Sequence, residues 1–526
     1  MKLWQQMIST AIVGTERQKF ELPPPADGDA VANLLGALAA AGDETRLLKA
    51  AAVLGSYLRS GIAAAPDAGA APEPAGDETR ASIPPLSENH LAAMLAGHHS
   101  RVLREFFELV AENGRVLPPP FLPAALDEGT SKSELRPFIV PILGARGRWL
   151  AGRRDDWSWA VAAENQTEKW ETGARAERLA ALAALRREDP AAARELLAAG
   201  WSAESAKDRA AFLEVLKTNL DAADGEFLER VRQTDKSADA RRAAVNLLLK
   251  IPGSPLRETL AAEAAALLVY KPGGFLSKAK LEVVFPADFD RDAKGDPLAD
   301  VELFLNEREL GKKAVRLVKL LHAVPPRFWE ERFGAPRETL VEAAKNTDWK
   351  NAVLTGFRAA ALNFADAEWL AAVLPESGQN DYYTLSNQIE RDWRHSQIEN
   401  LIEILLDGEP KTGLDRNFAV LLFNRLKERW SDEFSLKISN FLERESQVRD
   451  FKEFIGKEFI GIALPVLNSG HLFAVGQLAD FELRVLARLA GHLDKLPGYA
   501  RSAEDFAAVA AFRRELRAAF RNEEKL

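Results

Sequence analysis

The feature that most constrains the fold of this chain is an internal repeat with a period of 31 residues. Three consecutive blocks begin at Ala174, Ser205 and Lys236, and apolar residues recur in the same columns of each block. One column holds Leu182, Leu213 and Ala244, and another holds Leu185, Leu216 and Leu247. A repeat of this length is typical of a helix–turn–helix unit that stacks on its neighbours.

Each block has the pattern of two helices separated by a break. The breaks fall at Asp189–Pro190, near Asp221, and at Pro252–Gly253, and a proline just after a break suits the first turn of a helix. Neither helix of a pair can bury its apolar face alone, so neighbouring pairs must stack. The sequence therefore predicts an all-α fold, an α-solenoid of stacked antiparallel helix pairs, with Leu216 in its core.

The rest of the chain divides around this repeat. Hydrophobic residues make up 47% of the 526 residues, and the predominance of Ala and Leu among them favours helices over strands. We expect six segments: an N-terminal helical segment over 1–61, a flexible Ala/Pro/Gly linker over 62–86, a helical region over 87–172, HEAT-like repeats over 173–279, an inserted loop or hairpin over 280–297, and C-terminal helical repeats over 298–526.

Charge and composition exclude several classes of function. A formal net charge of -9 argues against a dedicated nucleic-acid binder, because such a protein needs a positive surface. The absence of cysteine excludes disulfides, thiolate nucleophiles and cysteine-ligated metals. The N-terminus lacks the pattern of a signal peptide, and no run reaches the ~20 apolar residues of a membrane span. We therefore expect a cytoplasmic protein that does not contact membranes.

The stretch GARGRWLAGRRDDWSWA, residues 144–160, looks most like a site. It lacks the lysine and hydroxyl residues of a phosphate-binding P-loop. We expect a helix from about 135 to 150, in which Gly144 and Gly147 permit close packing and which Gly152 ends. Trp157 and Trp159 should then bury against the first repeat. The arginines that remain form a candidate contact for an anion or a partner: Arg146, Arg148, Arg153 and Arg154.

Other candidate sites are weaker. His90, His98 and His99 have no carboxylate at metal-ligand spacing, so we interpret them as ordinary surface histidines. No G-x-S-x-G nucleophile motif occurs. Tryptophans near helix ends could stack nucleobases, but in a helical repeat they more often fill gaps between stacked pairs. We expect no catalytic residue, no metal and no cofactor.

Several motifs together carry a resemblance. STAIVGTER, GARGRWLAG followed by DW, WETGARAERLAAL, DPAAARELL and RRAAVNLLLKIPGSP occur in this order within residues 1–270. With them the chain resembles a bacterial family of unknown function, whose members are similar to HEAT-like helical-repeat proteins. The resemblance implies a HEAT/armadillo-like fold and gene neighbours that encode a SWIM zinc-finger protein, a MoxR-type AAA ATPase and a von Willebrand A-domain protein. It assigns no catalytic residue.

These observations favour a non-catalytic scaffold or adaptor for protein–protein interaction. The resemblance alone implies an AAA ATPase or a SWIM zinc-finger protein as the partner. Two alternatives remain. A nucleic-acid-binding HEAT-like protein would need a positive concave face, which the overall charge disfavours. An unrecognised enzyme would need a pocket with convergent carboxylates or histidines, and the sequence contains no such cluster.

Overall fold

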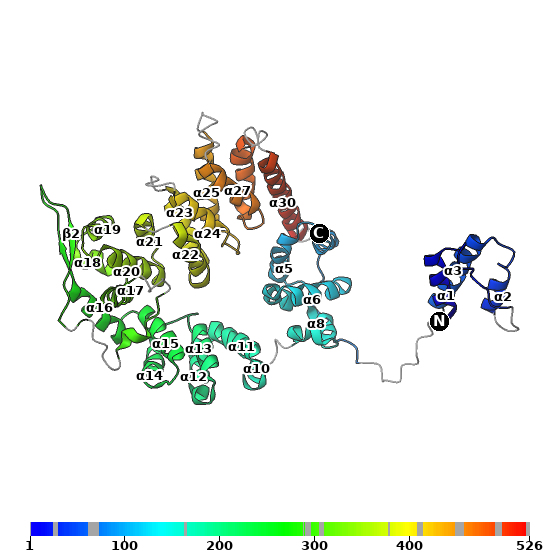
Figure 1. The fold of residues 1–526 in the computed structure, drawn as a ribbon, viewed down its shortest axis with the longest axis horizontal. Coiled ribbons are helices and arrows are strands. Elements are labelled where there is room, and N and C mark those ends of the chain that lie inside the picture. Colours follow the sequence, from blue (N-terminus) through cyan, green and yellow to red (C-terminus); the bar gives the residue numbers. More distant parts are fainter. Residues whose placement is uncertain are drawn as a thin grey trace. The chain divides into compact units, whose positions relative to one another are not determined.

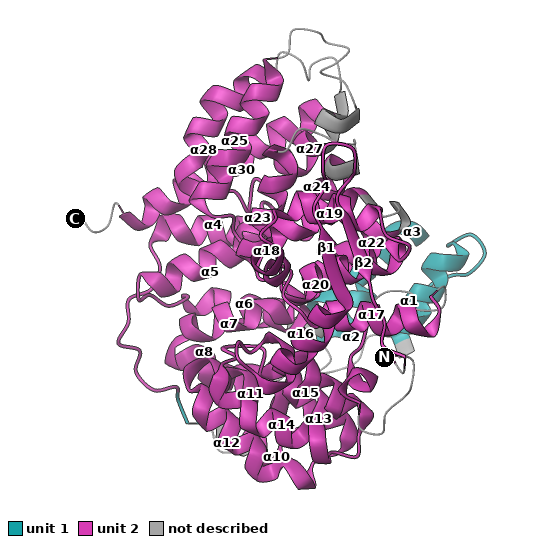
Figure 2. Ribbon diagram, turned by 90° about the vertical axis from the view of Figure 1, so that its left-hand side faces the viewer, with its two compact units in different colours: residues 1–74 teal, residues 75–526 magenta. Residues whose placement is uncertain are grey.

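The computed structural model describes residues 2–24, 30–60, 73–161, 166–287, 289, 296–303, 310–376, 379–407, 414–447, 457–489 and 497–521. Helices hold 73% of the described residues, and one small hairpin completes the regular structure described. The chain forms two compact units, residues 1–74 and 75–526, which Figure 2 distinguishes by colour. The prediction of a predominantly helical protein is confirmed.

The first unit is a small helical bundle. Its helices are α1 (Lys2–Val13), α2 (Ala30–Gly36) and α3 (Asp43–Ser60). Met7 of α1, Leu35 of α2 and Leu54 of α3 share one core cluster, which also includes Phe20. Residues 62–72 of the predicted linker lie outside the described residues, and its last part, from residue 73, belongs mainly to the second unit.

The second unit begins with a group of short helices: α4 (Pro85–Leu95), α5 (Leu103–Glu112), α6 (Leu122–Ser131), α7 (Arg136–Ile139), α8 (Gly144–Ala151) and α9 (Ser158–Val161). They share a core cluster that includes Phe106 and Phe107, both fully buried. Prolines and glycines divide this part of the chain, which explains why its helices are short.

The repeats follow as α10 (Gln166–Thr172), α11 (Arg175–Glu188), α12 (Pro190–Gly200), α13 (Ala206–Val215), α14 (Gly225–Thr234), α15 (Ala238–Lys250) and α16 (Pro255–Leu267). Helix α11 packs against α13, and α13 packs against α15 (Figure 1). Side chains cap several of these helices: Asp189, Ser205, Ser237 and Ser254 accept backbone N–H groups. Leu182, Leu213 and Ala244 of the first predicted column are fully buried, which confirms that column. In the second column Leu216 and Leu247 are fully buried, whereas Leu185 is half-buried and packs at the edge of the core.

The inserted hairpin follows α16 directly. Strand β1 (Leu268–Lys271) pairs antiparallel with β2 (Lys280–Val283), and Leu268 lies opposite Val283. The predicted insertion at 280–297 therefore contains only the second strand. The first strand begins at Leu268, before the predicted start of the insertion. The sequence LVYK is short enough to continue an apolar helical face, so periodicity alone could not separate it from α16.

The C-terminal part continues with paired helices: α17 (Lys312–His322), α18 (Arg327–Phe333), α19 (Arg337–Lys345), α20 (Lys350–Asn363), α21 (Ala367–Val373), α22 (Gln379–Asp392), α23 (His395–Asp407), α24 (Leu414–Phe423), α25 (Asp432–Ser446), α27 (Lys457–Asn468), α28 (Val475–Phe481) and α30 (Pro497–Arg521). Among the described residues no helix is long and apolar enough to cross a membrane.

The last helix closes the second unit on its first helices. Helix α30 packs against α27 and α28 and also against α4 (Figure 2). Phe506 and Ala510 of α30 belong to the core of the repeats, whereas Leu516 and Phe520 belong to the core of residues 83–160. We call this contact of α30 with α4 and α5 the seam.

Candidate functional site

The arginine- and glycine-rich stretch is broken into short helices. The predicted continuous helix over 135–150 is wrong: α7 ends at Ile139, a 3-10 turn spans Val140–Ile142, and α8 begins at Gly144. Gly144 has a φ of 66°, in the left-handed region that interrupts a right-handed helix. Pro141 adds to the break because it has no N–H to donate.

A carboxylate of the chain itself caps the N-terminus of α8. The backbone N–H of Ala145 donates to Glu78 Oε2 at 2.7 Å, and Arg80 links the same segment to the Pro141 carbonyl oxygen at 2.7 Å. Hydrogen bonding, chiefly from the Arg80 backbone N–H, holds the pKa of Glu78 below its usual value. A helix N-terminus attracts anions, and here Glu78 supplies the negative charge that a phosphate would bring.

Gly147 and Gly152 have the predicted roles, but the tryptophans do not. A Cβ on Gly147 would lie 3.0 Å from Leu122 Cδ2 of α6, so the glycine permits close packing, and α8 ends just before Gly152. Trp157 and Trp159 pack against α6 and not against the first repeat. Their Nε1 atoms donate to Asp127 Oδ1 at 2.8 Å and to Thr130 Oγ1 at 3.1 Å.

The four candidate arginines lie on α8 and the turn after it. Arg146, Arg153 and Arg154 are exposed, and Arg148 is half-buried. The Arg153 guanidinium lies 4.9 Å from the centroid of the Trp149 ring, and that of Arg154 lies 4.1 Å from Trp157. Arg154 also pairs with Asp156 at 3.2 Å. The four candidate residues, which we call the arginine rim, therefore follow one another along α8 and the turn after it, next to the exposed Asp155 and Asp156.

The first three histidines differ from their interpretation as surface residues. His90 is buried and lies edge-on to Phe512 of α30, and His99 stacks on the same ring at a centroid distance of 4.6 Å. Only His98 is exposed. The sequence could not indicate this because Phe512 lies more than 400 residues further along the chain. Among the described residues, no group of three potential ligands could hold a metal ion.

A buried ion pair holds the seam together. Arg513 is fully buried, and its Nε donates to Glu105 Oε2 at 2.6 Å. Its Nη1 donates to the carbonyl oxygens of Gly470 and Phe473 at 2.7 and 2.6 Å, and Arg517 donates to Glu105 Oε1 at 2.7 Å. Burial lowers the pKa of Arg513, and Glu105 opposes this effect. The Nη2 of Arg513 has no hydrogen-bond partner among the described residues.

Two polar recesses of about 370 and 680 Å³ lie beside this ion pair, and Arg101 and His471 line both. Burial and the charges of Arg101 and Arg513 lower the pKa of His471 to about 4, so its imidazole is neutral near pH 7 and a weak base. Glu108 pairs with both Arg104 and Arg429, at 3.0 and 3.7 Å. The recesses are therefore lined by charges that largely neutralise one another.

The repeats contain a second periodic pattern, of tryptophan, arginine and acid, that sequence analysis missed. Arg178 lies over Trp170 at 4.6 Å and donates to Glu204 at 2.9 Å. One period later, Arg209 lies over Trp201 at 5.8 Å and donates to Asp235 at 3.0 Å. Each member is displaced by 31 residues, as in 170 + 31 = 201 and 178 + 31 = 209. The same 31-residue spacing of tryptophan, arginine and acidic residues in the sequence could have predicted this pattern.

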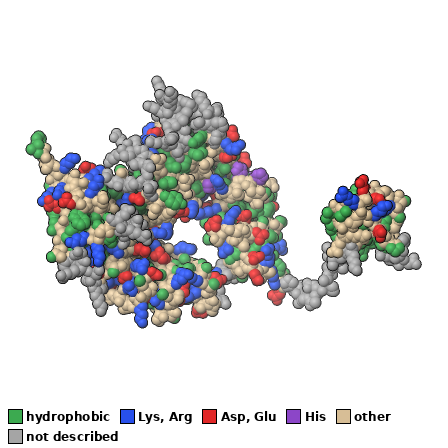
Figure 3. Space-filling model, in the orientation of Figure 1, with side chains coloured by type: hydrophobic (Ala, Val, Ile, Leu, Met, Phe, Trp, Pro, Cys, Tyr) green, Lys and Arg blue, Asp and Glu red, His purple; other side chains and the backbone are tan. Residues whose placement is uncertain are grey.

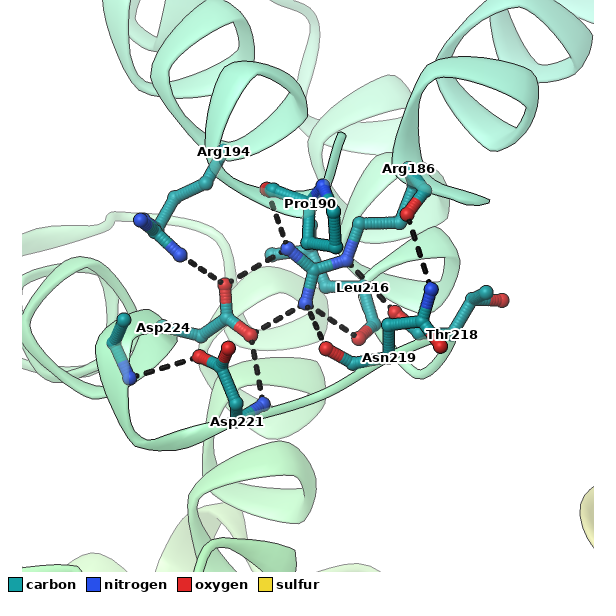
Figure 4. Close-up of polar contacts among 9 residues, drawn as sticks. Arg186, Pro190, Arg194, Leu216, Thr218, Asn219, Asp221 and Asp224 are labelled. Carbon is teal, nitrogen blue, oxygen red and sulfur yellow. Dashed lines mark hydrogen bonds and ion pairs between the residues drawn. The ribbon is translucent and has the colours of Figure 1, made fainter. Parts of the chain in front are cut away.

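A fully buried arginine also joins the first two repeats (Figure 4). Arg186 at the end of α11 donates through Nη1 to Asp224 Oδ1 at 3.0 Å and through Nε to the Thr218 carbonyl oxygen at 2.8 Å. Its other acceptors are the carbonyl oxygens of Pro190, Leu216 and Asn219. Arg194 also pairs with Asp224, at 3.1 Å. This network joins helices and builds no site.

These features define a largely helical protein whose described surface carries the arginine rim and two polar recesses. The chain belongs to the DUF5691 family, a family of unknown function whose model matches residues 6–520. No curated protein matches the chain, and no solved structure does so. The predicted membership of a family of unknown function is confirmed over nearly the whole chain.

Proposed function

We propose that this chain is a non-catalytic α-solenoid scaffold of the HEAT/armadillo kind that binds protein partners. The stacking of α11 on α13 and of α13 on α15 supports the solenoid assignment, because each repeat then contacts mainly its neighbours. Such stacks present long exposed surfaces that suit the binding of other proteins.

The arginine rim carries the proposal. Arg146, Arg153 and Arg154 are exposed, and ion pairs at such positions contribute little to stability. The rings of Trp149 and Trp157 lie against the guanidinium groups of Arg153 and Arg154 and restrict these two side chains before binding. The arginines therefore lose less conformational entropy when a partner binds. An arginine rim on a protein of net charge -9 fits an acidic patch on a partner.

The partner that we propose is a MoxR-type AAA ATPase or a SWIM zinc-finger protein. This part of the proposal rests on the resemblance to a family whose genes neighbour such proteins. The chain would act as an adaptor that joins the ATPase to another component, and the fold and the arginine rim do not distinguish between the two candidate partners.

Binding of the full chain to each purified candidate tests the proposal. Replacing Arg146, Arg148, Arg153 and Arg154 by alanine should weaken binding about tenfold at low salt, and the difference should shrink as salt screens the charges. A matched control replaces four other exposed arginines, Arg187, Arg230, Arg327 and Arg394. Both variants should keep the Tm of the parent. Equal loss of binding in the two variants would contradict a specific role for the rim.

A nucleotide assay tests the alternative of a phosphate site. ATP with magnesium should not raise the Tm of the parent, because Glu78 already occupies the N-terminus of α8. A rise of several degrees that the four alanine substitutions abolish would identify the rim as a nucleotide site and overturn the proposal of a non-catalytic scaffold.

A further inference from the structure

The tip of the hairpin exposes two large apolar side chains. Phe275 and Leu276 have relative exposures of 103% and 96%, the highest among the large hydrophobic residues of the described chain. Figure 3 shows the tip as a projecting hydrophobic group at the upper left, at the end of the hairpin seen in Figure 1. Turn positions usually hold polar residues or glycine, so the fold itself gives no reason for Phe and Leu here.

Hydrogen bonds across the turn define its geometry. The Gly274 N–H donates to the Ser277 carbonyl oxygen at 3.0 Å, and the Ser277 N–H donates back to the Gly274 carbonyl oxygen at 3.3 Å. The Gly274 N–H also lies 3.0 Å from Ser277 Oγ. Phe275 and Leu276 are therefore the two central residues of a closed turn, so binding would cost little backbone entropy.

The base of the hairpin is anchored in the second unit. Leu268 and Leu281 are buried in the main core, and Asn346 Nδ2 after α19 donates to the Ala279 carbonyl oxygen at 3.0 Å. Tyr270 packs on Phe333 of α18, with ring centroids 5.6 Å apart. The base of the hairpin is therefore fixed by packing and hydrogen bonding, and its apolar tip projects from the second unit.

Positive charge surrounds the tip. The hairpin, residues 268–283, carries Lys271, Lys278 and Lys280 against Glu282, which gives 3 − 1 = 2 net positive charges. Lys271 pairs with Glu282 at 2.7 Å. A binding surface complementary to this tip would be apolar at its centre and acidic at its border.

We propose that Phe275 and Leu276 form the anchor of a protein interface and insert into an apolar pocket that carboxylates border on the partner. This inference rests on the proposed scaffold function and adds a second contact to it, separate from the arginine rim. The net charge of -9 favours a protein pocket over an anionic membrane, because a pocket encloses only the basic tip whereas a membrane faces the whole molecule.

A photo-crosslinking amino acid at position 276 of the full chain in its native cells tests this. The crosslinked protein is identified, purified and titrated against the parent and against the double variant Phe275→Ser/Leu276→Ser. We expect a roughly 100-fold weaker Kd for the double variant, because central apolar anchors dominate interfaces. Leu483→Ser removes another side chain that is 79% exposed, and it should change neither the Kd nor the Tm.

Each outcome supports or overturns the anchor. Crosslinks that map to an apolar, acid-bordered pocket, with loss of binding only in the tip variant, support it. The same crosslinking amino acid at position 483 measures the background. Crosslinks from position 276 to lipid, to a second copy of the chain, or to no molecule above that background overturn it. If the tip variant retains partner binding that the rim substitutions abolish, only the anchor fails. If neither set weakens binding to any protein partner, the scaffold proposal fails as well.

Discussion

The junction of the first two repeats and the seam each contain a fully buried arginine, but the two differ in how far apart in sequence their partners lie. The partners of Arg186 lie within 38 residues of it, and they engage all three of its nitrogens. Arg513 bonds to Glu105, 408 residues away, and its Nη2 has no partner among the described residues. The junction is therefore a local structure built from residues 186–224 of the first two repeats.

The seam, by contrast, forms only when the whole second unit has folded. Its contacts close a long loop, and the loss of chain entropy on closure offsets part of what those contacts contribute. A free guanidinium nitrogen adds the cost of desolvating an unpaired donor. We therefore expect the seam to open at a lower free energy than the repeats unfold, and the predictions that follow test this difference.

The largest effect should come from the repeat junction. Arg186→Met leaves Asp224 buried with only Arg194 as its charged partner and removes the donor to four backbone carbonyls. Breaking such a pair costs about 3 to 5 kcal/mol. Hydrogen exchange should accelerate over α11–α14, while α4, α5 and α30 keep their protection. Arg187→Met changes the exposed neighbour and should have almost no effect.

At the seam we expect Arg513→Met to cost about 3 kcal/mol, because Glu105 retains Arg517 as a partner. Hydrogen exchange should accelerate together in α5 and α30, which lie near opposite ends of the unit's sequence but contact each other. It should remain slow in α13 and α15. Arg514→Met, on the exposed face of the same helix, serves as the control. Loss of protection confined to α30 would mean that the seam does not couple the two ends.

The repeats could be predicted from sequence and the seam could not, for a physical reason. The column of Leu182, Leu213 and Ala244 is visible because identical surroundings recur every 31 residues. Arg513 and Glu105 have no such regularity, since their pairing depends on the path of the intervening helices. A large separation in sequence also conceals the stacking of His99 on Phe512. The helix predicted over 135–150 is broken by Pro141 together with the positive φ at Gly144.

Acidification should also distinguish the two regions. The pKa of His471 is about 4 in the folded protein, against an ordinary value of 6.5, so between these values the unfolded chain binds a proton that the native state does not. Stability at the seam should fall by about 2 kcal/mol from pH 7 to pH 5. No histidine occurs between residues 100 and 321, so the repeats lack this effect.

Hydrogen exchange at pH 7 and pH 5, corrected for the intrinsic rate, measures this difference in α5 and α30 against α13 and α15. His471→Gln removes one titrating group and should reduce the pH dependence at the seam, while His90, whose pKa burial also lowers, retains part of it. His322 also has a pKa of about 4 because it is buried, so His322→Gln should change the pH dependence of α17 without changing that of the seam. A pH dependence equal in seam and repeats would contradict the assignment to His471.

The smallest effect should come from the cap of α8, which lies in the same region as the arginine rim. Glu78→Gln keeps the shape of the side chain but removes its charge from the helix N-terminus, and the largely exposed position limits the expected loss to about 0.5 kcal/mol. The change should appear mainly in the exchange of the Ala145 amide, which donates to Glu78. Asp77→Asn alters the exposed neighbour and serves as the control. Because the variant no longer places a negative charge at the N-terminus of α8, it should also bind inorganic phosphate more readily than the parent. Equal affinity for phosphate in parent and variant would show that the helix N-terminus is no anion site even without its carboxylate.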